Sequence, residues 1–124
     1  MIPAVVMAGG AGTRLRPLTT SLPKPLLPVL NRPMLQHVLR LLQRHGVTDA
    51  VITVQFLASL VRSYTGDGSE LGMNLTYSSE DAPLGTAGSV KNAERALRGG
   101  TFLVISGDAI TDMDLTALIE HHRT

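Results

Sequence analysis

The sequence predicts an α/β sandwich, in which helices pack on both sides of a mostly parallel β-sheet. Short apolar runs rich in β-branched residues alternate with segments of helical periodicity along the 124 residues, and this alternation is typical of parallel βαβ units. Clusters of glycine and proline separate the runs, as turns and loops do. Polar clusters follow several of the apolar runs, and the carboxyl ends of parallel strands are where such folds bind ligands.

The chain opens with one strand and a long loop. Ile2–Met7 is a short apolar run rich in β-branched residues, which predicts a buried strand. The glycine cluster Ala8–Gly12 ends it. Residues 13–33 contain five prolines, which argue against a continuous helix there.

A first helix is expected directly after this loop. Asn31 or Arg32 would precede it, Pro33 would lie near its first turn, and Gly46 would end it. Its predicted buried face recurs at helical spacing and consists of Met34, Val38, Leu41, Leu42 and His45.

The middle of the chain predicts a strand, a helix, a loop and a strand. In chain order these elements are Ala50–Val54, Phe56–Tyr64, Thr65–Gly72 and Met73–Tyr77. The predicted buried face of the helix consists of Phe56, Leu60 and Val61.

The last part predicts a helix, a fourth strand and a final helix. The helix Ala87–Leu97 would end at Gly99-Gly100, and its inward residues would be Val90, Ala93, Ala96 and Leu97. The strand Phe102–Ile105 is followed by Ser106-Gly107-Asp108. The final helix would begin at Asp112 or Asp114, both good caps, and would bury Leu115, Leu118 and Ile119.

Composition excludes several classes of protein. The absence of cysteine excludes disulfides, thiol catalysis and cysteine-ligated zinc. No stretch approaches the roughly 20 apolar residues of a membrane span, and the first residues lack the basic region of a secretory signal, so we expect a cytoplasmic protein without a membrane partner. Two tyrosines and two phenylalanines are too few for a base-stacking nucleic-acid module.

Charge is divided unevenly along the chain. Residues 1–48 carry six basic and no acidic residues, whereas residues 49–124 carry five basic and all ten acidic residues. Arg14 and Lys24 therefore have no carboxylate partner nearby in the sequence. Both suit phosphate, since arginine offers a planar fork of donors and lysine a mobile point charge.

The glycine cluster has two interpretations. Glycines after a strand let backbone amides approach an anionic ligand, so one interpretation of the cluster Ala8–Gly12 is a phosphate cradle. A dinucleotide fingerprint would need glycine at position 15, and a P-loop would end in Gly-Lys-Ser or Gly-Lys-Thr, so neither motif fits. The other interpretation is a tight turn without a ligand.

Two acidic residues also have two interpretations each. Asp108 follows an apolar strand and a glycine, a placement suited to holding Mg²⁺ against phosphate oxygens, or it caps the next segment. Glu80 is either a solvated loop acid beside Asp81 or an acceptor for a base edge. Guanine, with its N1–H and N2 amine, would suit this carboxylate better than uracil or thymine would.

The motifs together resemble a known family. Gly9–Thr19 reads GGAGTRLRPLT and Pro23–Val29 reads PKPLLPV, and this pair resembles the signature of the sugar-1-phosphate nucleotidyltransferases. Pro83–Gly88, which reads PLGTAG, and Asn31-Arg32-Pro33 look most like the mannose-1-phosphate guanylyltransferases. The resemblance implies a Rossmann-like, three-layer α/β/α fold, here truncated.

The resemblance also implies a reaction and a site. A sugar 1-phosphate would attack the α-phosphorus of a nucleoside triphosphate, with GTP and mannose 1-phosphate favoured and Mg²⁺ as cofactor. The Ala8–Thr13 backbone would hold the nucleotide and Arg14 its triphosphate. Lys24 would bridge the reacting phosphates, Glu80 and Gly85 would face the base, and Asp108 would bind the metal.

Two alternatives and one departure accompany this interpretation. Glucose 1-phosphate with UTP or dTTP would use the same chemistry, and a non-catalytic nucleotide-binding homologue would use none. Members of the family have a longer catalytic domain. Residues 1–124 would be its N-terminal, nucleotide-binding part, with the remaining half as partner, and a homo-oligomer is also permitted.

Overall fold

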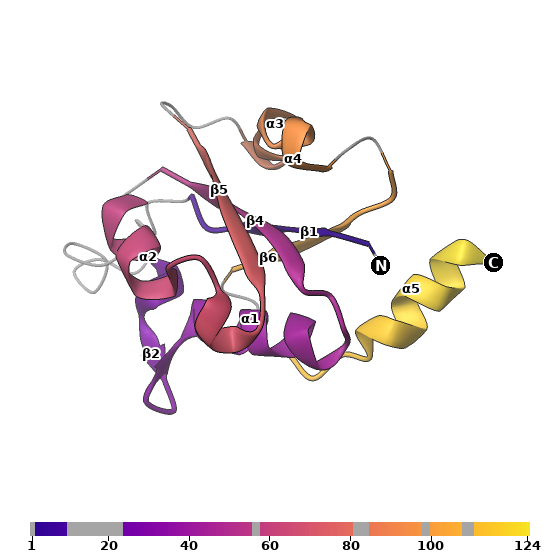
Figure 1. The fold of residues 1–124 in the computed structure, drawn as a ribbon, viewed down its shortest axis with the longest axis horizontal. Helices are drawn as coiled ribbons and strands as arrows, with labels where there is room; N and C mark the ends of the chain where they lie inside the picture. Colours follow the sequence, from indigo (N-terminus) through magenta and orange to yellow (C-terminus); the bar gives the residue numbers. More distant parts are fainter. Residues whose placement is uncertain (1, 10–23, 56–57, 81–84, 98–99, 108–110) are drawn as a thin grey trace.

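The computed structural model describes residues 2–9, 24–55, 58–80, 85–97, 100–107 and 111–124 (Figure 1). Its centre is a four-stranded sheet of β1 (Ala4–Met7), β4 (Asp49–Val54), β5 (Asn74–Ser79) and β6 (Leu103–Ser106) in the order β5-β4-β1-β6. Every neighbouring pair in this sheet is parallel. The predicted α/β sandwich is therefore confirmed.

Helices cover the two faces of the sheet (Figure 1). One face packs on α1 (Met34–Arg44), α2 (Ala58–Thr65) and the start of α5 (Leu115–Arg123), and α3 (Gly85–Asn92) and α4 (Glu94–Leu97) lie over the other. Side chains alternate accordingly along β1, since Ala4 and Val6 belong to the core under α1 while Val5 is buried on the opposite face. Because both faces of the central strands are covered, these strands are continuously apolar.

The helix α1 begins later than the sequence predicts. Residues Pro28–Val29 (β2) and Arg32–Pro33 (β3) form a short antiparallel hairpin, so the chain is still extended at Pro33, which is the N-cap of α1. Leu30 and Asn31 form its turn with φ values of 52° and 66°. Gly46, with φ of 75°, lies just past the end of the helix, as predicted.

The predicted buried face of α1 is correct except at its ends. Val38, Leu41 and Leu42 are buried, whereas Met34 and His45 are half-buried. His45 is the C-cap residue and its Nδ1 lies 2.8 Å from the Thr116 hydroxyl, so it joins α1 to α5 at the surface.

Several other boundaries also differ from the prediction. β5 ends at Ser79 rather than Tyr77, and the segment before it contains the short 3₁₀ helix η3 (Ser69–Leu71). The predicted helix 87–97 begins at Gly85 and is interrupted at Ala93, whose backbone N–H bonds the Val90 carbonyl. Phe56, on the predicted face of α2, lies outside the described residues.

Two residues that the sequence predicts to be buried are exposed, for the same physical reason. Leu60 is 38% exposed on α2 and Leu118 is 43% exposed on α5, although Val61 and Leu115 beside them in each helix are buried. Each helix packs through a narrow stripe, so only part of its apolar residues reaches the sheet. Asp114, not Asp112, caps α5, since its carboxylate accepts from the Ala117 amide at 3.0 Å.

None of the described helices is long and apolar enough to cross a bilayer.

Candidate functional site

The candidate site lies at the edge of the sheet where the parallel strands end. β1 continues into Ala8 and Gly9, β4 into Gln55, β5 into Glu80 and β6 into Gly107. Ala8 is held there by its backbone N–H, which lies 3.1 Å from the Thr53 carbonyl and 3.3 Å from the Thr53 hydroxyl. The glycine cluster therefore leaves the sheet from a fixed point.

Gly107 brings the end of β6 against the end of β1. Its amide donates to the Met7 carbonyl at 2.9 Å. A Cβ built on Gly107 would lie 3.1 Å from that same carbonyl oxygen and 3.4 Å from the Ala8 Cβ. The close backbone approach thus favours glycine at this position, one residue before Asp108.

Glu80 is the most informative of the predicted site residues. It follows β5 directly, its amide donates to the Val54 carbonyl at 2.9 Å, and only 8% of its surface is exposed. Its Oε1 lies 3.2 Å from where a Cβ on Gly9 would stand. The carboxylate therefore lies against Gly9, and the interpretation as a solvated loop acid is wrong.

The second oxygen of this carboxylate lacks a partner in the described part of the chain. Glu80 Oε2 is buried and no hydrogen-bond donor of the described residues reaches it. A buried carboxylate is costly unless donors satisfy it. A ligand that presents N–H groups at this edge would supply them.

Gln55 is a site residue that the sequence reasoning missed. It is half-buried, and its Cβ lies 3.6 Å from the Cβ position on Gly9. Gly9 therefore has the Glu80 carboxylate and Gln55 close beside it. The available signal was its position as a polar residue directly after the buried apolar strand β4.

The structure brings three of the predicted site residues together and places two others on separate helices. Ala8, Gly9 and Glu80 lie together, whereas Gly85 is the first residue of α3 and Lys24 begins the 3₁₀ helix η2 (Lys24–Leu26), which packs on α1. The other predicted site residues, Gly10, Gly12, Thr13, Arg14 and Asp108, lie outside the described residues.

The described residues do not by themselves fit a metal site. Within the ranges that the structure covers, no group of three or more histidine, aspartate or glutamate side chains is placed to hold an ion. Asp108, the predicted ligand, is not among those residues, so a metal enters only as part of the proposal below.

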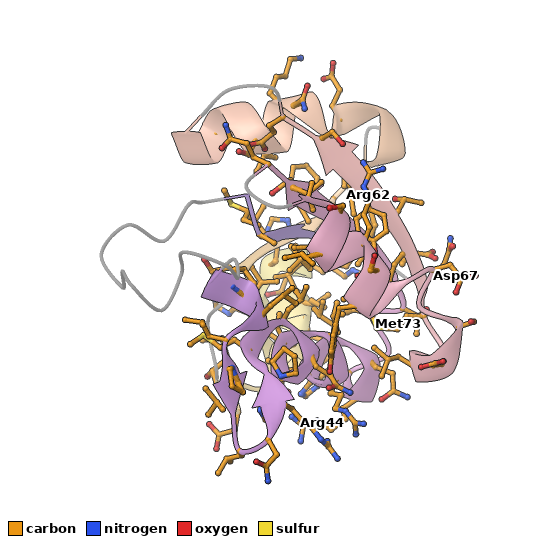
Figure 2. All side chains as sticks on the ribbon, turned by 90° about the vertical axis from the view of Figure 1, so that its left-hand side faces the viewer. Arg44, Arg62, Asp67 and Met73 are labelled. Carbon is orange, nitrogen blue, oxygen red and sulfur yellow. The ribbon has the colours of Figure 1, made fainter. Side chains whose placement is uncertain are left out.

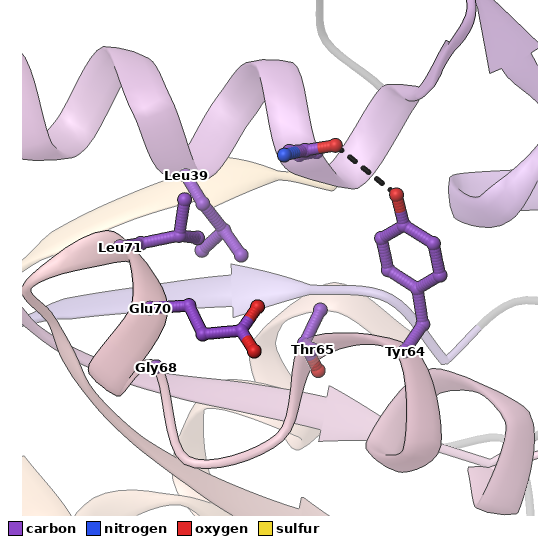
Figure 3. A pocket seen from close by; sticks show the side chains of 7 residues that line it. Leu39, Tyr64, Thr65, Gly68, Glu70 and Leu71 are labelled. Carbon is purple, nitrogen blue, oxygen red and sulfur yellow. Dashed lines mark hydrogen bonds between the residues drawn. The ribbon is translucent and has the colours of Figure 1, made fainter.

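A separate cavity lies near the amino end of β5. It has a volume of about 270 Å³ and lies between α1 and the segment from α2 to η3 (Figure 3). Leu39 and Leu71 form its apolar wall, and the Tyr64 hydroxyl donates to Gln36 Oε1 at 3.1 Å across its rim. Since Gly68 and Leu71 precede β5 and Glu80 follows it, this cavity is not part of the candidate site.

Comparison with known proteins gives consistent matches along the chain. The family model described as Nucleotidyl transferase matches residues 3–124. A mannose-1-phosphate guanylyltransferase of Mycobacterium tuberculosis is 40% identical over 123 residues, which are 99% of this chain and 34% of the relative. A UTP--glucose-1-phosphate uridylyltransferase of Synechocystis is 37% identical over 131 residues, covering 97% of this chain and 34% of the relative.

The solved structures agree with these matches. HddC from Yersinia pseudotuberculosis, complexed with GMP-PN, superposes with a TM-score of 0.87 at 29% identity. The match covers 98% of this chain and 54% of that one. The chain thus spans about a third of the length of the curated relatives above and about half of this solved one.

Proposed function

Because this chain belongs to the nucleotidyl transferase family, we propose that it forms the nucleotide-binding part of a sugar-1-phosphate nucleotidyltransferase. In the proposed reaction, a phosphate oxygen of the sugar 1-phosphate forms a bond to the α-phosphorus of a nucleoside triphosphate. The bond from that phosphorus to the oxygen bridging to the β-phosphorus breaks, and pyrophosphate leaves. Such a reaction needs positioning and charge neutralisation more than covalent help from the protein.

The proposed base is guanine, and the buried Glu80 carboxylate is the observation that carries it. Its Oε2 lacks a partner among the described residues, at the strand end where the glycine cluster begins. Guanine presents two adjacent donors, N1–H and the N2 amine, which match the two oxygens of a carboxylate. The guanylyltransferase relative and the GMP-PN complex are consistent with this choice.

The remaining roles are assigned by motif position. We propose that the backbone of Ala8–Thr13 holds the nucleotide, that Arg14 binds its triphosphate and that Lys24 lies between the reacting phosphates. Gly85, at the start of α3, would line the base pocket. The charges of Arg14 and Lys24 would stabilise the phosphates most strongly in a site that excludes water.

Mg²⁺ and Asp108 belong to the same proposal. Gly107 joins the ends of β6 and β1, so Asp108 and the glycine cluster leave the sheet from neighbouring strands. A carboxylate there is the hard oxygen ligand that Mg²⁺ prefers, and the bound ion would neutralise phosphate charge. The proposed substrates are phosphorylated metabolites, which is consistent with the expected cytoplasmic location.

We propose that the rest of the catalytic domain covers β6. In the described residues β6 pairs only with β1, and Phe102 and Val104 on one face of it are 37% and 42% exposed. The relatives are about three times as long as this chain, so their additional residues are numerous enough to cover β6. The sugar pocket would then lie between the two parts.

The guanine assignment is tested by replacing the carboxylate with an amide. Glu80→Gln, made in the protein as its gene encodes it, keeps the shape of the side chain but loses one acceptor. The dissociation constant for GTP should rise about tenfold, while those for UTP and dTTP should change less than about twofold. Glu120→Gln, the same exchange at an exposed position of α5, should change none of the three dissociation constants. Tighter binding of UTP than of GTP to the unmodified protein would favour the alternative of a uridylyltransferase, with which the Synechocystis relative is consistent.

A second substitution separates an enzyme from a non-catalytic homologue. Arg14→Ala should lower the rate of pyrophosphate release from GTP and mannose 1-phosphate by about 100-fold or more. The substitution removes the positive charge that is proposed to stabilise the reacting phosphates. A protein that releases no pyrophosphate, and in which Arg14→Ala leaves nucleotide binding unchanged, would support the non-catalytic alternative.

A further inference from the structure

The backbone just before Glu80 lies at an open edge of the sheet. β5 is the first strand in the order β5-β4-β1-β6, and the Glu80 amide makes the last bond of its ladder with Val54. Since neighbouring residues of a strand direct their backbone groups to opposite sides, the Ser79 carbonyl faces away from β4. Among the described residues, no further strand pairs with this carbonyl.

A side chain of α3 donates a hydrogen bond to the Ser79 carbonyl. Asn92, the last residue of α3, donates its Nδ2 to the Ser79 carbonyl at 3.0 Å and to the Ser78 hydroxyl at 3.2 Å. Asn92 therefore joins the end of β5 to the helix that follows Glu80 in the chain.

A side chain of α2 donates a hydrogen bond to the hydroxyl of Ser79. Arg62 donates its Nη2 to Ser79 Oγ, and Figure 2 shows Arg62 on α2. The guanidinium carbon also lies 5.4 Å from the centre of the Tyr77 ring, within the range of a cation–π contact. The Tyr77 hydroxyl in turn donates to the Gly66 carbonyl at 2.5 Å, which anchors this side of β5 to the end of α2.

We propose that Arg62, Ser79 and Asn92, called here the Ser79 clamp, position the Glu80 carboxylate for recognition of the base. The inference rests on the proposed function, because it takes Glu80 as the base acceptor. Arg62 and Asn92 are positioning residues in this proposal, since each contacts Ser79 and would act on the base through Glu80. They hold the residue next to Glu80 from two helices at once.

The physical reason is the geometry of a two-oxygen acceptor. A carboxylate accepts two parallel N–H donors only in a narrow range of orientations, so an error of about 1 Å in its backbone removes one of the two bonds. The ladder bond from Glu80 to Val54 fixes one side of this backbone. The Ser79 clamp fixes the other side, which would otherwise be a free strand edge.

The test compares GTP with ITP, which keeps N1–H but lacks the N2 amine. The native gene product should bind GTP about tenfold more tightly than ITP, since one bond to a charged acceptor is lost. Asn92→Ala and Arg62→Ala should reduce that ratio to about threefold or less, with ITP binding nearly unchanged. Asn92→Gln, which keeps an amide donor, should restore part of the ratio.

Two control substitutions match the clamp residues, one by its position and one by its residue type. Lys91→Ala changes the residue before Asn92 on α3; the Lys91 ammonium pairs with Glu94 at 2.7 Å. Arg44→Ala removes an exposed arginine from α1 (Figure 2). Neither should alter the GTP to ITP ratio. Ser79→Ala removes only the hydroxyl that Arg62 contacts, so Arg62→Ala should add little in its presence.

The possible outcomes separate this inference from the function on which it rests. A ratio that stays at the native value in Asn92→Ala, Arg62→Ala and Ser79→Ala, while Glu80→Gln abolishes it, overturns the positioning role alone. A ratio that Glu80→Gln also leaves unchanged overturns the base contact and with it the Ser79 clamp. If Asn92→Ala does not fold, Ser79→Ala and Arg62→Ala decide the question.

Discussion

At the scale of single residues, the site depends on the close approach of Glu80 to Gly9. The carboxylate oxygen Oε1 lies 3.2 Å from the Cβ position of Gly9, so a methyl group there would press on the carboxylate. Gly9 is not among the residues with positive φ, so an alanine there would not be strained by its backbone. The contact with Glu80 can therefore be tested by itself.

Gly9→Ala should weaken GTP binding with little loss of stability. The new methyl group would press on the Glu80 carboxylate and shift it by a few tenths of an ångström, and we expect the dissociation constant for GTP to rise about tenfold. Titration calorimetry with GTP measures this, and thermal unfolding should shift by less than about 4 °C, the equivalent of roughly 1 kcal/mol. Gly100→Ala is the control, since nothing lies within 4 Å of a Cβ there. Native GTP affinity in Gly9→Ala would contradict the close contact.

At the scale of elements, β5 and the segments beside it determine where Glu80 stands. Gly68 turns the chain into η3 with φ of 86°, and a Cβ on it would lie 2.6 Å from Leu75 Cγ and 2.7 Å from the Met73 carbonyl oxygen. On the same face of β5, Tyr77 reaches Gly66 at the end of α2. The strand that carries Glu80 is thus packed tightly at its start and anchored in its middle.

Gly68→Ala should destabilise the fold more than Gly72→Ala. Both glycines have positive φ, 86° and 68°, so both substitutions carry a backbone cost of about 1–2 kcal/mol. Only at Gly68 does the added methyl also clash with β5, which should cost a further 1–3 kcal/mol or so. Urea unfolding of the two variants measures the difference. Equal losses would mean that the clash is relieved without cost.

Tyr77 should make the fold sensitive to alkaline pH. Burial raises the pKa of the Tyr77 phenol above its usual value of about 10, although the Thr65 hydrogen bond and the charge of Arg62 oppose the shift. A raised pKa in the folded state means that this group's stabilisation is fully present below pH ~10 and is lost as pH rises through the folded pKa. The free energy of unfolding should therefore fall above pH ~10 in the native protein and fall less in Tyr77→Phe. Tyr64→Phe, at a half-exposed tyrosine, is the control, and identical slopes in all three proteins would contradict the shift.

The elements differ in how far the sequence could predict them. All four strands and the main helices follow from periodicity, since each has at least four residues of consistent pattern. The β2–β3 hairpin was missed because strands of two residues carry no period, and because its turn uses Leu30 and Asn31 instead of glycine.

The candidate site was predictable only in part. Gly9 and Glu80 were found from the glycine cluster and the family resemblance. The burial of Glu80 was not, because it depends on β5 extending two residues past the predicted end at Tyr77. The contacts of Arg62 and Asn92 with Ser79 join residues 17 and 13 positions apart, and no sequence pattern encodes such a pairing.

At the scale of the whole molecule, the uncovered face of β6 is the main feature. α3 and α4 cover the buried Val5 and Val51 but leave Phe102 and Val104 exposed on the same face. A cavity of about 420 Å³ lies between these helices and Phe102. β6 is also the last strand in the sheet order of the described residues, and an edge strand with exposed apolar side chains tends to associate with other chains.

The 124-residue chain, expressed by itself, should associate through β6. Val104→Lys should reduce that association, since a charge at the exposed position opposes pairing of strand edges. Leu30→Lys is the matched control, because Leu30 is 85% exposed on the hairpin and not on β6. Sedimentation velocity over a range of concentrations measures both. A chain that stays monomeric, or one that Leu30→Lys affects as strongly, would contradict a role for this edge.

The central claim is that a guanine nucleotide is transferred to a sugar 1-phosphate at the strand ends that carry Gly9 and Glu80. Release of pyrophosphate by the native gene product, with mannose 1-phosphate, Mg²⁺ and GTP, UTP or dTTP in turn, tests it most directly. The account predicts the fastest release with GTP, and a preference for GTP that disappears in Glu80→Gln. Release that is as fast with UTP, or a GTP preference that survives Glu80→Gln, would contradict it.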